Sequence, residues 1–203
     1  MFPFNKTIRI LVFTDFIINS GWGLLSPVFA VFLLGSIEGG DASVAGIAAG
    51  TYFIIKSVAQ IPIGKHLDKN HGEKDDFWFM VGGMALVGLV PLGYLVAYLP
   101  WHIYVMQAIF GIGMSLTVPS WGGIFTRHMD KGKEAETWGF ESSSLGLGMG
   151  VAGIVGGLVA KTLGFTPLFI SVSVLNFIGV GLYYLIYSSM LPRGKTVAFP
   201  PRA

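Results

Sequence analysis

The chain has 203 residues, of which 53% are hydrophobic and 12% are charged, with a formal net charge of +2 at pH 7. Soluble globular domains carry about 25% charged residues, so this composition excludes an ordinary water-soluble fold. The absence of cysteine excludes disulfides and thiolate metal sites, and 29 glycines are typical of closely packed membrane helices.

Six apolar runs are long enough to cross a bilayer, which requires about 20 residues per helix. We therefore predict an all-α membrane protein made of a single six-helix domain over residues 1–203. The predicted spans are residues 8–34, 43–64, 77–99, 102–126, 138–160 and 167–190, followed by a cytoplasmic tail at 191–203.

Basic residues gather at the span ends that lie on one predicted side of the membrane. Of the 13 basic residues, that side holds Lys6, Arg9, Lys65, Lys69, Lys74, Arg127, Lys131, Lys133, Arg193, Lys195 and Arg202. Lys161 lies on the other side, and Lys56 lies within a span. Because cytoplasmic loops are enriched in lysine and arginine, both termini are predicted to be cytoplasmic, in a plasma (inner) membrane protein.

Polar side chains recur at helical spacing within the first two spans. Asp15, Asn19, Trp22 and Ser26 follow one another at intervals of four, three and four residues, and Tyr52, Lys56 and Gln60 at intervals of four. Such intervals place side chains on one face of a helix. The two stripes are candidates for the wall of a polar cavity, although Trp22 alone is also explained by packing.

Two opposite charges within these stripes are predicted to lie at similar depth. With a rise of about 1.5 Å per residue, Asp15 lies roughly 10 Å and Lys56 roughly 12 Å from the cytoplasmic ends of their predicted spans. The two side chains are therefore expected to pair. Ionisable groups inside a membrane usually serve function, and the alternative is that they only tie helices together.

Two further polar residues complete the candidate cavity. Glu141 lies one turn into the fifth span, where its charge would also be stabilised by the helix dipole, and Gln107 lies in the fourth span. The histidines lie in loops or at span ends, so no metal site is predicted.

The fifth span also carries regularly spaced glycines. Gly146, Gly150, Gly153 and Gly157 recur at intervals of four, three and four residues. This pattern predicts a face without side chains, on which another helix backbone packs closely.

The segment between the second and third spans resembles the signature loop of the major facilitator superfamily. Gly64, Asp68 and Lys69 match its pattern, whereas Gly72 falls one position late. The fifth span is similar to the helix 5 motif of the proton-antiporter branch. There Gly139, Gly148, Gly156 and Gly157 match, and Gly153 stands in place of the motif's proline. In the fourth span Gln107 occupies a position where the family usually has arginine.

This resemblance implies a fold equivalent to one half of a twelve-helix transporter. It further implies a secondary transporter that moves a small solute by alternating access, with a proton gradient and no cofactor, and with antiport or efflux favoured. We expect a parallel homodimer in lipid with a central cavity lined by the first, second, fourth and fifth helices. By the same resemblance, Asp68 and Lys69 latch onto the start of the partner's fifth helix.

Other functions remain as alternatives. A membrane enzyme is disfavoured because neither Gly-x-Ser-x-Gly nor His-Glu-x-x-His occurs, and no nucleic-acid partner is expected. A non-transporting membrane subunit and a half-transporter that requires a different six-helix partner both remain open. The cavity residues suit a sugar, a cationic drug or an amphipathic metabolite.

Overall fold

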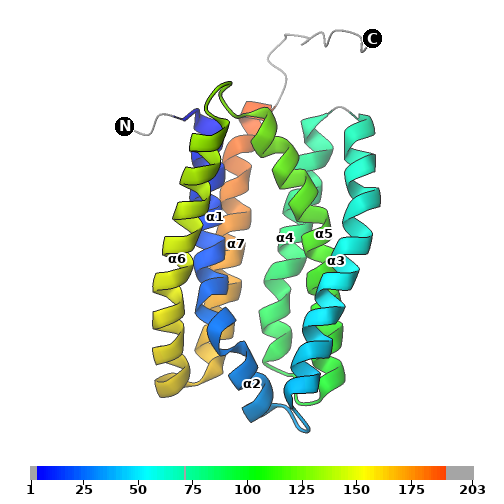
Figure 1. The fold of residues 1–203 in the computed structure, drawn as a ribbon, viewed down its shortest axis with the longest axis vertical. Helices are drawn as coiled ribbons and strands as arrows, with labels where there is room; N and C mark the ends of the chain where they lie inside the picture. Colours follow the sequence, from blue (N-terminus) through cyan, green and yellow to red (C-terminus); the bar gives the residue numbers. More distant parts are fainter. Residues whose placement is uncertain (1–3, 71, 191–203) are drawn as a thin grey trace.

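The computed structural model describes residues 4–70 and 72–190, and the predicted cytoplasmic tail at 191–203 lies outside this range. Its elements are α1 (Lys6–Leu25), η1 (Ser26–Val28), α2 (Phe29–Ser36), α3 (Ala42–Asn70), α4 (Glu73–Tyr94), α5 (Pro100–Arg127), α6 (Glu134–Leu163) and α7 (Phe165–Met190). No strand occurs among the described residues. Six helical segments are long and apolar enough to cross a membrane, which confirms the predicted all-α six-helix fold (Figure 1).

The first membrane-length segment is interrupted rather than continuous. A single 3-10 turn at Ser26–Val28 separates α1 from α2. Proline has no backbone N–H, and its ring crowds the preceding helical turn, so Pro27 accounts for the interruption. The sequence prediction of one unbroken helix over residues 8–34 did not include this break.

The helix α3 continues to Asn70, six residues beyond the predicted end of its span at residue 64. The charged segment that begins at Gly64, predicted to be a loop, is therefore helical up to Asn70. The prediction ended the helix where the apolar run ends. A helix can continue into water, however, because its backbone hydrogen bonds are satisfied internally and its charged side chains are solvated.

The helices form two groups of three that interlock. One group contains α1, α6 and α7, and the other contains α3, α4 and α5 (Figure 1). Each group thus combines the first helix of one half of the chain with the second and third helices of the other half. The groups meet mainly where α4 packs on α7. Both halves contribute to one buried cluster that includes Leu11, Phe77, Phe125 and Tyr183.

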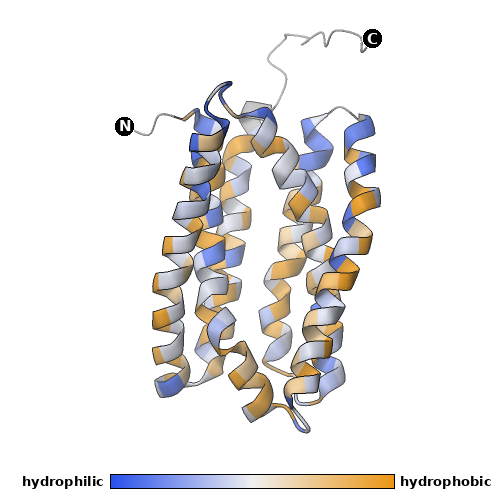
Figure 2. Ribbon diagram, in the orientation of Figure 1, coloured by the Kyte–Doolittle hydropathy of each residue, from blue (hydrophilic) through white to orange (hydrophobic). Residues whose placement is uncertain are grey.

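Charged side chains gather where α1 begins, α3 ends, α4 begins and α5 ends. Figure 2 shows hydrophilic residues at this end of the bundle and hydrophobic residues along the middle of the helices. Arg127 forms ion pairs with Asp76 and, at 3.3 Å, with Glu73. These pairs join the start of α4 to the end of α5.

Glycines allow the backbones of α1 and α6 to approach closely. A Cβ atom on Gly23 would lie 2.8 Å from the Cα of Met149, and one on Gly148 would lie 2.7 Å from the Ser20 hydroxyl. A Cβ atom on Gly156 would collide with the carbonyl group of Leu24. Contacts this short leave no space for a side chain, so the packing of α1 on α6 depends on these glycines.

The glycine face packed against α1 differs from the predicted stripe. Gly146, Gly150 and Gly157, as well as Gly139, have no atom within 4 Å of a Cβ position, whereas Gly153 would meet Pro27 at 3.2 Å. The stripe of α6 that contacts α1 consists of Gly148, Ala152 and Gly156. Both stripes have helical spacing, so spacing alone does not determine which one faces a neighbour in the same chain.

We expect Gly156→Ala to lower the thermal stability of the protein in lipid nanodiscs. Overpacking of this kind typically costs about 1–3 kcal/mol. The matched control is Gly157→Ala, whose methyl group enters open space and which should leave the unfolding temperature unchanged or slightly raised, because alanine favours helix over glycine. Equal unfolding temperatures for the two variants would contradict the proposed close contact of α6 with Leu24.

Candidate functional site: a cavity between the two helix groups

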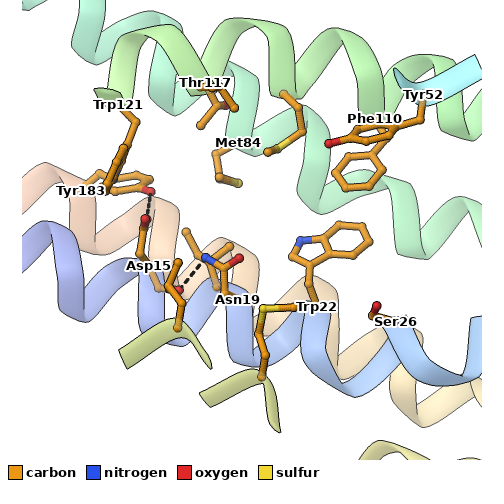
Figure 3. Close-up of a pocket in the computed structure, with 15 residues that line it drawn as sticks. Asp15, Asn19, Trp22, Ser26, Tyr52, Met84, Phe110, Thr117, Trp121 and Tyr183 are labelled. Atoms are coloured by element: carbon orange, nitrogen blue, oxygen red, sulfur yellow. Dashed lines mark hydrogen bonds between the residues drawn. The ribbon is translucent and has the colours of Figure 1, made fainter. Parts of the chain in front are cut away.

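A cavity of about 430 Å³ lies between the two helix groups (Figure 3). Two stripes of side chains form most of its wall. One stripe comes from α1 and η1 and contains Asp15, Ile18, Asn19, Trp22 and Ser26, and the other comes from α5 and contains Phe110, Met114, Thr117, Val118 and Trp121. The remaining lining residues are Tyr52 on α3, Met84 on α4, Leu145 and Met149 on α6, and Tyr183 on α7.

Asp15 forms the acidic end of the cavity. Its Oδ1 accepts a hydrogen bond of 2.9 Å from the hydroxyl of Tyr183, and Trp121 lies beside that phenol ring (Figure 3). The amide of Asn19 donates to the backbone carbonyl of Asp15 at 2.9 Å. Among the described residues no hydrogen-bond donor contacts the second carboxylate oxygen, so Asp15 retains an acceptor for a solute or a proton.

Three stacked aromatic rings form the opposite end of the cavity. The rings of Trp22 and Phe110 are parallel to within 6°, with centroids 4.5 Å apart, and Tyr52 stacks on Phe110 at 4.6 Å. This aromatic stack joins α1, α5 and α3. Trp22, Ser26 and Phe110 also line a second, smaller cavity of about 170 Å³ on the other side. Trp22 and Phe110 of the aromatic stack, together with Ser26, therefore lie between the two cavities.

Gln107 belongs to the second cavity and not to the main one. Its side-chain amide donates a hydrogen bond of 3.2 Å to the hydroxyl of Tyr94, which is itself buried. The structure thus separates Gln107 from Asp15 and Asn19, with which the sequence analysis grouped it.

The predicted pair of Asp15 and Lys56 is wrong. Both residues are described, yet no ion pair joins them: Asp15 bonds to Tyr183, and the Lys56 ammonium lies 5.7 Å from the ring centroid of Tyr52. Because α3 continues to Asn70, Lys56 is 14 residues, or about 21 Å, from the end of its helix. Asp15 is nine residues, or about 14 Å, from the start of α1, so the two groups differ in depth.

Two other predicted residues lie outside the main cavity. Gln60 is half-buried on α3, and its carbonyl oxygen has no hydrogen-bond partner in the described part of the chain. Glu141 is buried on α6, with an exposed fraction of 6%. Its side chain is not among those that line the main cavity.

The residues predicted to form the latch lie at the junction of α3 and α4. Gly64, Asp68 and Lys69 occupy the last turns of α3, and Gly72 directly precedes α4 in an extended conformation. Asp68 and Lys69 are exposed, and within the described residues neither forms an ion pair. Their carboxylate and ammonium groups are thus accessible to another protein surface.

Sequence reasoning missed the α5 stripe and Tyr183. Phe110, Met114, Thr117 and Trp121 recur at intervals of four, three and four residues, as the α1 stripe does, so the signal was present. For Tyr183 no comparable signal exists. It is adjacent to Tyr184 in an apolar helix, and only the packing of α7 on α1 distinguishes the two phenols.

The described residues contain no cluster of three or more His, Asp or Glu side chains that could hold a metal ion. Six membrane-length helices in two interlocked groups, with a cavity between them, define a multi-pass membrane protein. The sequence profile of the Major Facilitator Superfamily matches residues 11–202, and the chain belongs to this superfamily.

Individual proteins agree with this assignment. The chain is 25% identical over 160 residues to an uncharacterized MFS-type transporter of Methanocaldococcus jannaschii, covering 79% of this chain and 40% of that protein. It is 28% identical over 178 residues to the inner membrane transport protein YajR of Escherichia coli, covering 79% of this chain and 37% of that protein. The chain therefore spans about two fifths of the length of these relatives.

A solved structure has the same fold at low sequence identity. The crystal structure of an auto-inhibited POT family peptide transporter superposes with a TM-score of 0.68 and 13% identity, over 98% of this chain and 40% of that one. At this identity the likeness concerns the fold alone.

Proposed function

We propose that this chain forms half of a secondary active transporter, which moves a small solute by alternating access around the cavity at Asp15. The observation that supports this most is the aromatic stack of Trp22, Phe110 and Tyr52. It separates a larger cavity, on the side where α1 begins, from a smaller cavity on the side of α2. A transporter requires a barrier of this kind, which closes the solute site from one side at a time.

Because the chain has no native cysteine, alternating access can be tested without a known substrate. We expect an Asn19→Cys variant in sealed membrane vesicles to react with an impermeant maleimide added on either side, because Asn19 lines the main cavity. Lys133→Cys and Lys161→Cys are exposed controls, and they should react only from the cytoplasmic side and only from the opposite side, respectively. Reaction of the Asn19→Cys variant from one side alone would favour a non-transporting subunit. The two controls also test whether both termini are cytoplasmic.

Asp15 is the proposed proton carrier, with a proton gradient as the energy source and antiport favoured by the glycine motif of α6. The titratable groups that face it are Tyr183 on α7 and Glu141 on α6, and Tyr52 on α3 lines the same cavity. A carboxylate that gains or loses a proton as its surroundings change can couple transport to pH.

We expect pH to shift the ratio of inside to outside labelling of the Asn19→Cys variant. The additional substitution Asp15→Asn should abolish this pH dependence, because an amide does not titrate in this range. Glu141→Gln, made in the same Asn19→Cys background, is the control for the neighbouring acid. In this control the ratio of inside to outside labelling should still depend on pH. If the Asp15→Asn protein responds to pH as its parent does, another group carries the proton.

We also propose a parallel homodimer in which α3 of each copy faces α6 of the other. These two helices are the least buried of the six membrane-length segments, and they expose apolar residues that include Ile54, Val58, Val151 and Ile154. Lys56 is half-buried at the midpoint of α3, about 21 Å from either end, which is too far for its side chain to reach the bilayer surface. A charge at the centre of a lipid-facing helix costs at least about 2.5 kcal/mol, so a protein or water interface is favoured there.

In this dimer the proposed latch would join the two copies. Asp68 at the end of α3 would face the start of the partner's α6, where free backbone N–H groups and the helix dipole stabilise a carboxylate. Lys69 would lie beside the acidic residues Glu134 and Glu136 in the first turn of that helix.

The dimer is tested by the mass of the protein in lipid nanodiscs across dilution. We expect a species of twice 21.8 kDa for the wild type and a larger monomer fraction for Gly150→Leu. Gly150 has nothing within 4 Å of its Cβ position, so this substitution should alter the interface and not the fold of one copy. Val174→Leu, on the exposed face of α7, is the control and should remain dimeric. A wild-type monomer would exclude the homodimer and require another partner.

A further inference from the structure

The chemistry of the main cavity narrows the class of solute. We infer that the cavity binds an organic cation with an apolar body, such as an aromatic or alkyl ammonium. This inference rests on the proposed transport function and deepens it. Two properties of the cavity wall carry it: its single carboxyl group and its aromatic and thioether surface.

Among the described residues that line the cavity, Asp15 is the only Asp, Glu, Lys, Arg or His. Lys56 and Glu141 do not line the cavity, and no lysine, arginine or histidine does. The hydroxyl of Tyr183 donates a hydrogen bond to one carboxyl oxygen of Asp15, and the other oxygen has no partner among the described residues. A buried carboxylate without a cationic partner is complementary to a positively charged solute, whereas an anion there would meet repulsion and no compensating base.

The remaining wall suits the body of such a cation. Trp22, Tyr52 and Phe110 form the aromatic end, and Trp121 lies near Asp15 at the other end (Figure 3). Aromatic faces attract ammonium groups, most strongly where water is excluded. Three methionines, Met84, Met114 and Met149, add flexible thioether surface that adapts to solutes of different shape.

Some of the polar groups in the wall are already bonded within the protein. The side-chain amide nitrogen of Asn19 is bonded to the Asp15 carbonyl, and the Thr117 hydroxyl donates to the Gly113 carbonyl at 3.0 Å. Among the described residues the indole N–H of Trp121 has no hydrogen-bond partner, so the wall keeps one free donor near Asp15. The volume of about 430 Å³ falls in the range of sites for drug-sized molecules.

The test compares two probes that share a benzyl body and carry opposite charges. Isothermal titration of the protein in nanodiscs, with empty nanodiscs as the reference, should give saturable binding of benzyltrimethylammonium and none of benzylsulfonate. We expect Asp15→Asn to weaken benzyltrimethylammonium binding by at least about tenfold, because it removes the charge that attracts the cation. Lys161→Gln is the control and should bind as the wild type does, since Lys161 is exposed at the end of α6 and lies outside the cavity wall.

A second variant distinguishes the carboxylate charge from its structural role. Tyr183→Phe removes the hydrogen bond to Asp15 but retains the carboxylate, so cation binding should persist. Binding of benzylsulfonate or glucose in place of the cation would overturn the inference, as would equal loss of cation binding in Asp15→Asn and Tyr183→Phe. Failure to bind the cation while the Asn19→Cys variant still labels from both sides would reject only the solute class. Labelling from one side alone would reject the transport function itself.

Discussion

Within a bilayer every polar side chain that leaves water must find its partner in the protein, and this constraint orders the interior of the bundle. Tyr183 on α7 bonds to Asp15 on α1, and Asn176 on α7 donates to the Met84 carbonyl on α4 at 2.8 Å. Gln107 on α5 bonds to Tyr94 on α4. Two of these bonds join helices that are distant in the sequence, and the third joins the consecutive helices α4 and α5. The polar groups that need partners therefore also fix which helices lie side by side.

The polar groups that the bundle does not satisfy are therefore informative. One oxygen of Asp15 has no partner among the described residues, and the ammonium group of Lys56 lies at mid-helix, 5.7 Å from the ring centroid of Tyr52. The carbonyl oxygen of Gln60 is also without a partner in the described part of the chain. In the proposed assembly these groups have separate roles: Asp15 meets solute or proton, whereas Lys56 and Gln60 face the interface of α3 with another membrane domain.

The sequence predicts those features that depend on local order. Apolar runs predict six spans, and helical spacing places Asp15, Asn19, Trp22 and Ser26 on one face, where the structure has them lining one cavity. The prediction that Lys56 pairs with Asp15 was wrong because the depth of Lys56 was counted from a misplaced end of α3. Hydropathy marks where the apolar run ends, whereas the helix itself continues to Asn70. The bond of Tyr183 to Asp15 and the packing of Gly148 and Gly156 on α1 are contacts between helices that are distant in the sequence. Residue spacing within one helix does not predict such contacts.

The position of Pro27 bears on how the barrier between the cavities can open. The 3-10 turn at Ser26–Val28 lies about one helical turn beyond Trp22, and Ser26 itself lines both cavities. Proline cannot donate the backbone hydrogen bond that would continue α1 into α2.

A displacement of α2, whose Phe29 lines the smaller cavity, therefore breaks fewer backbone hydrogen bonds than a bend elsewhere in the segment. Meanwhile α1 remains held against α6 by Gly148 and Gly156. The chain thus combines an acid on one side of the aromatic stack with an interrupted helix on the other, and in the proposed transporter the smaller cavity would change shape while Asp15 stays in place.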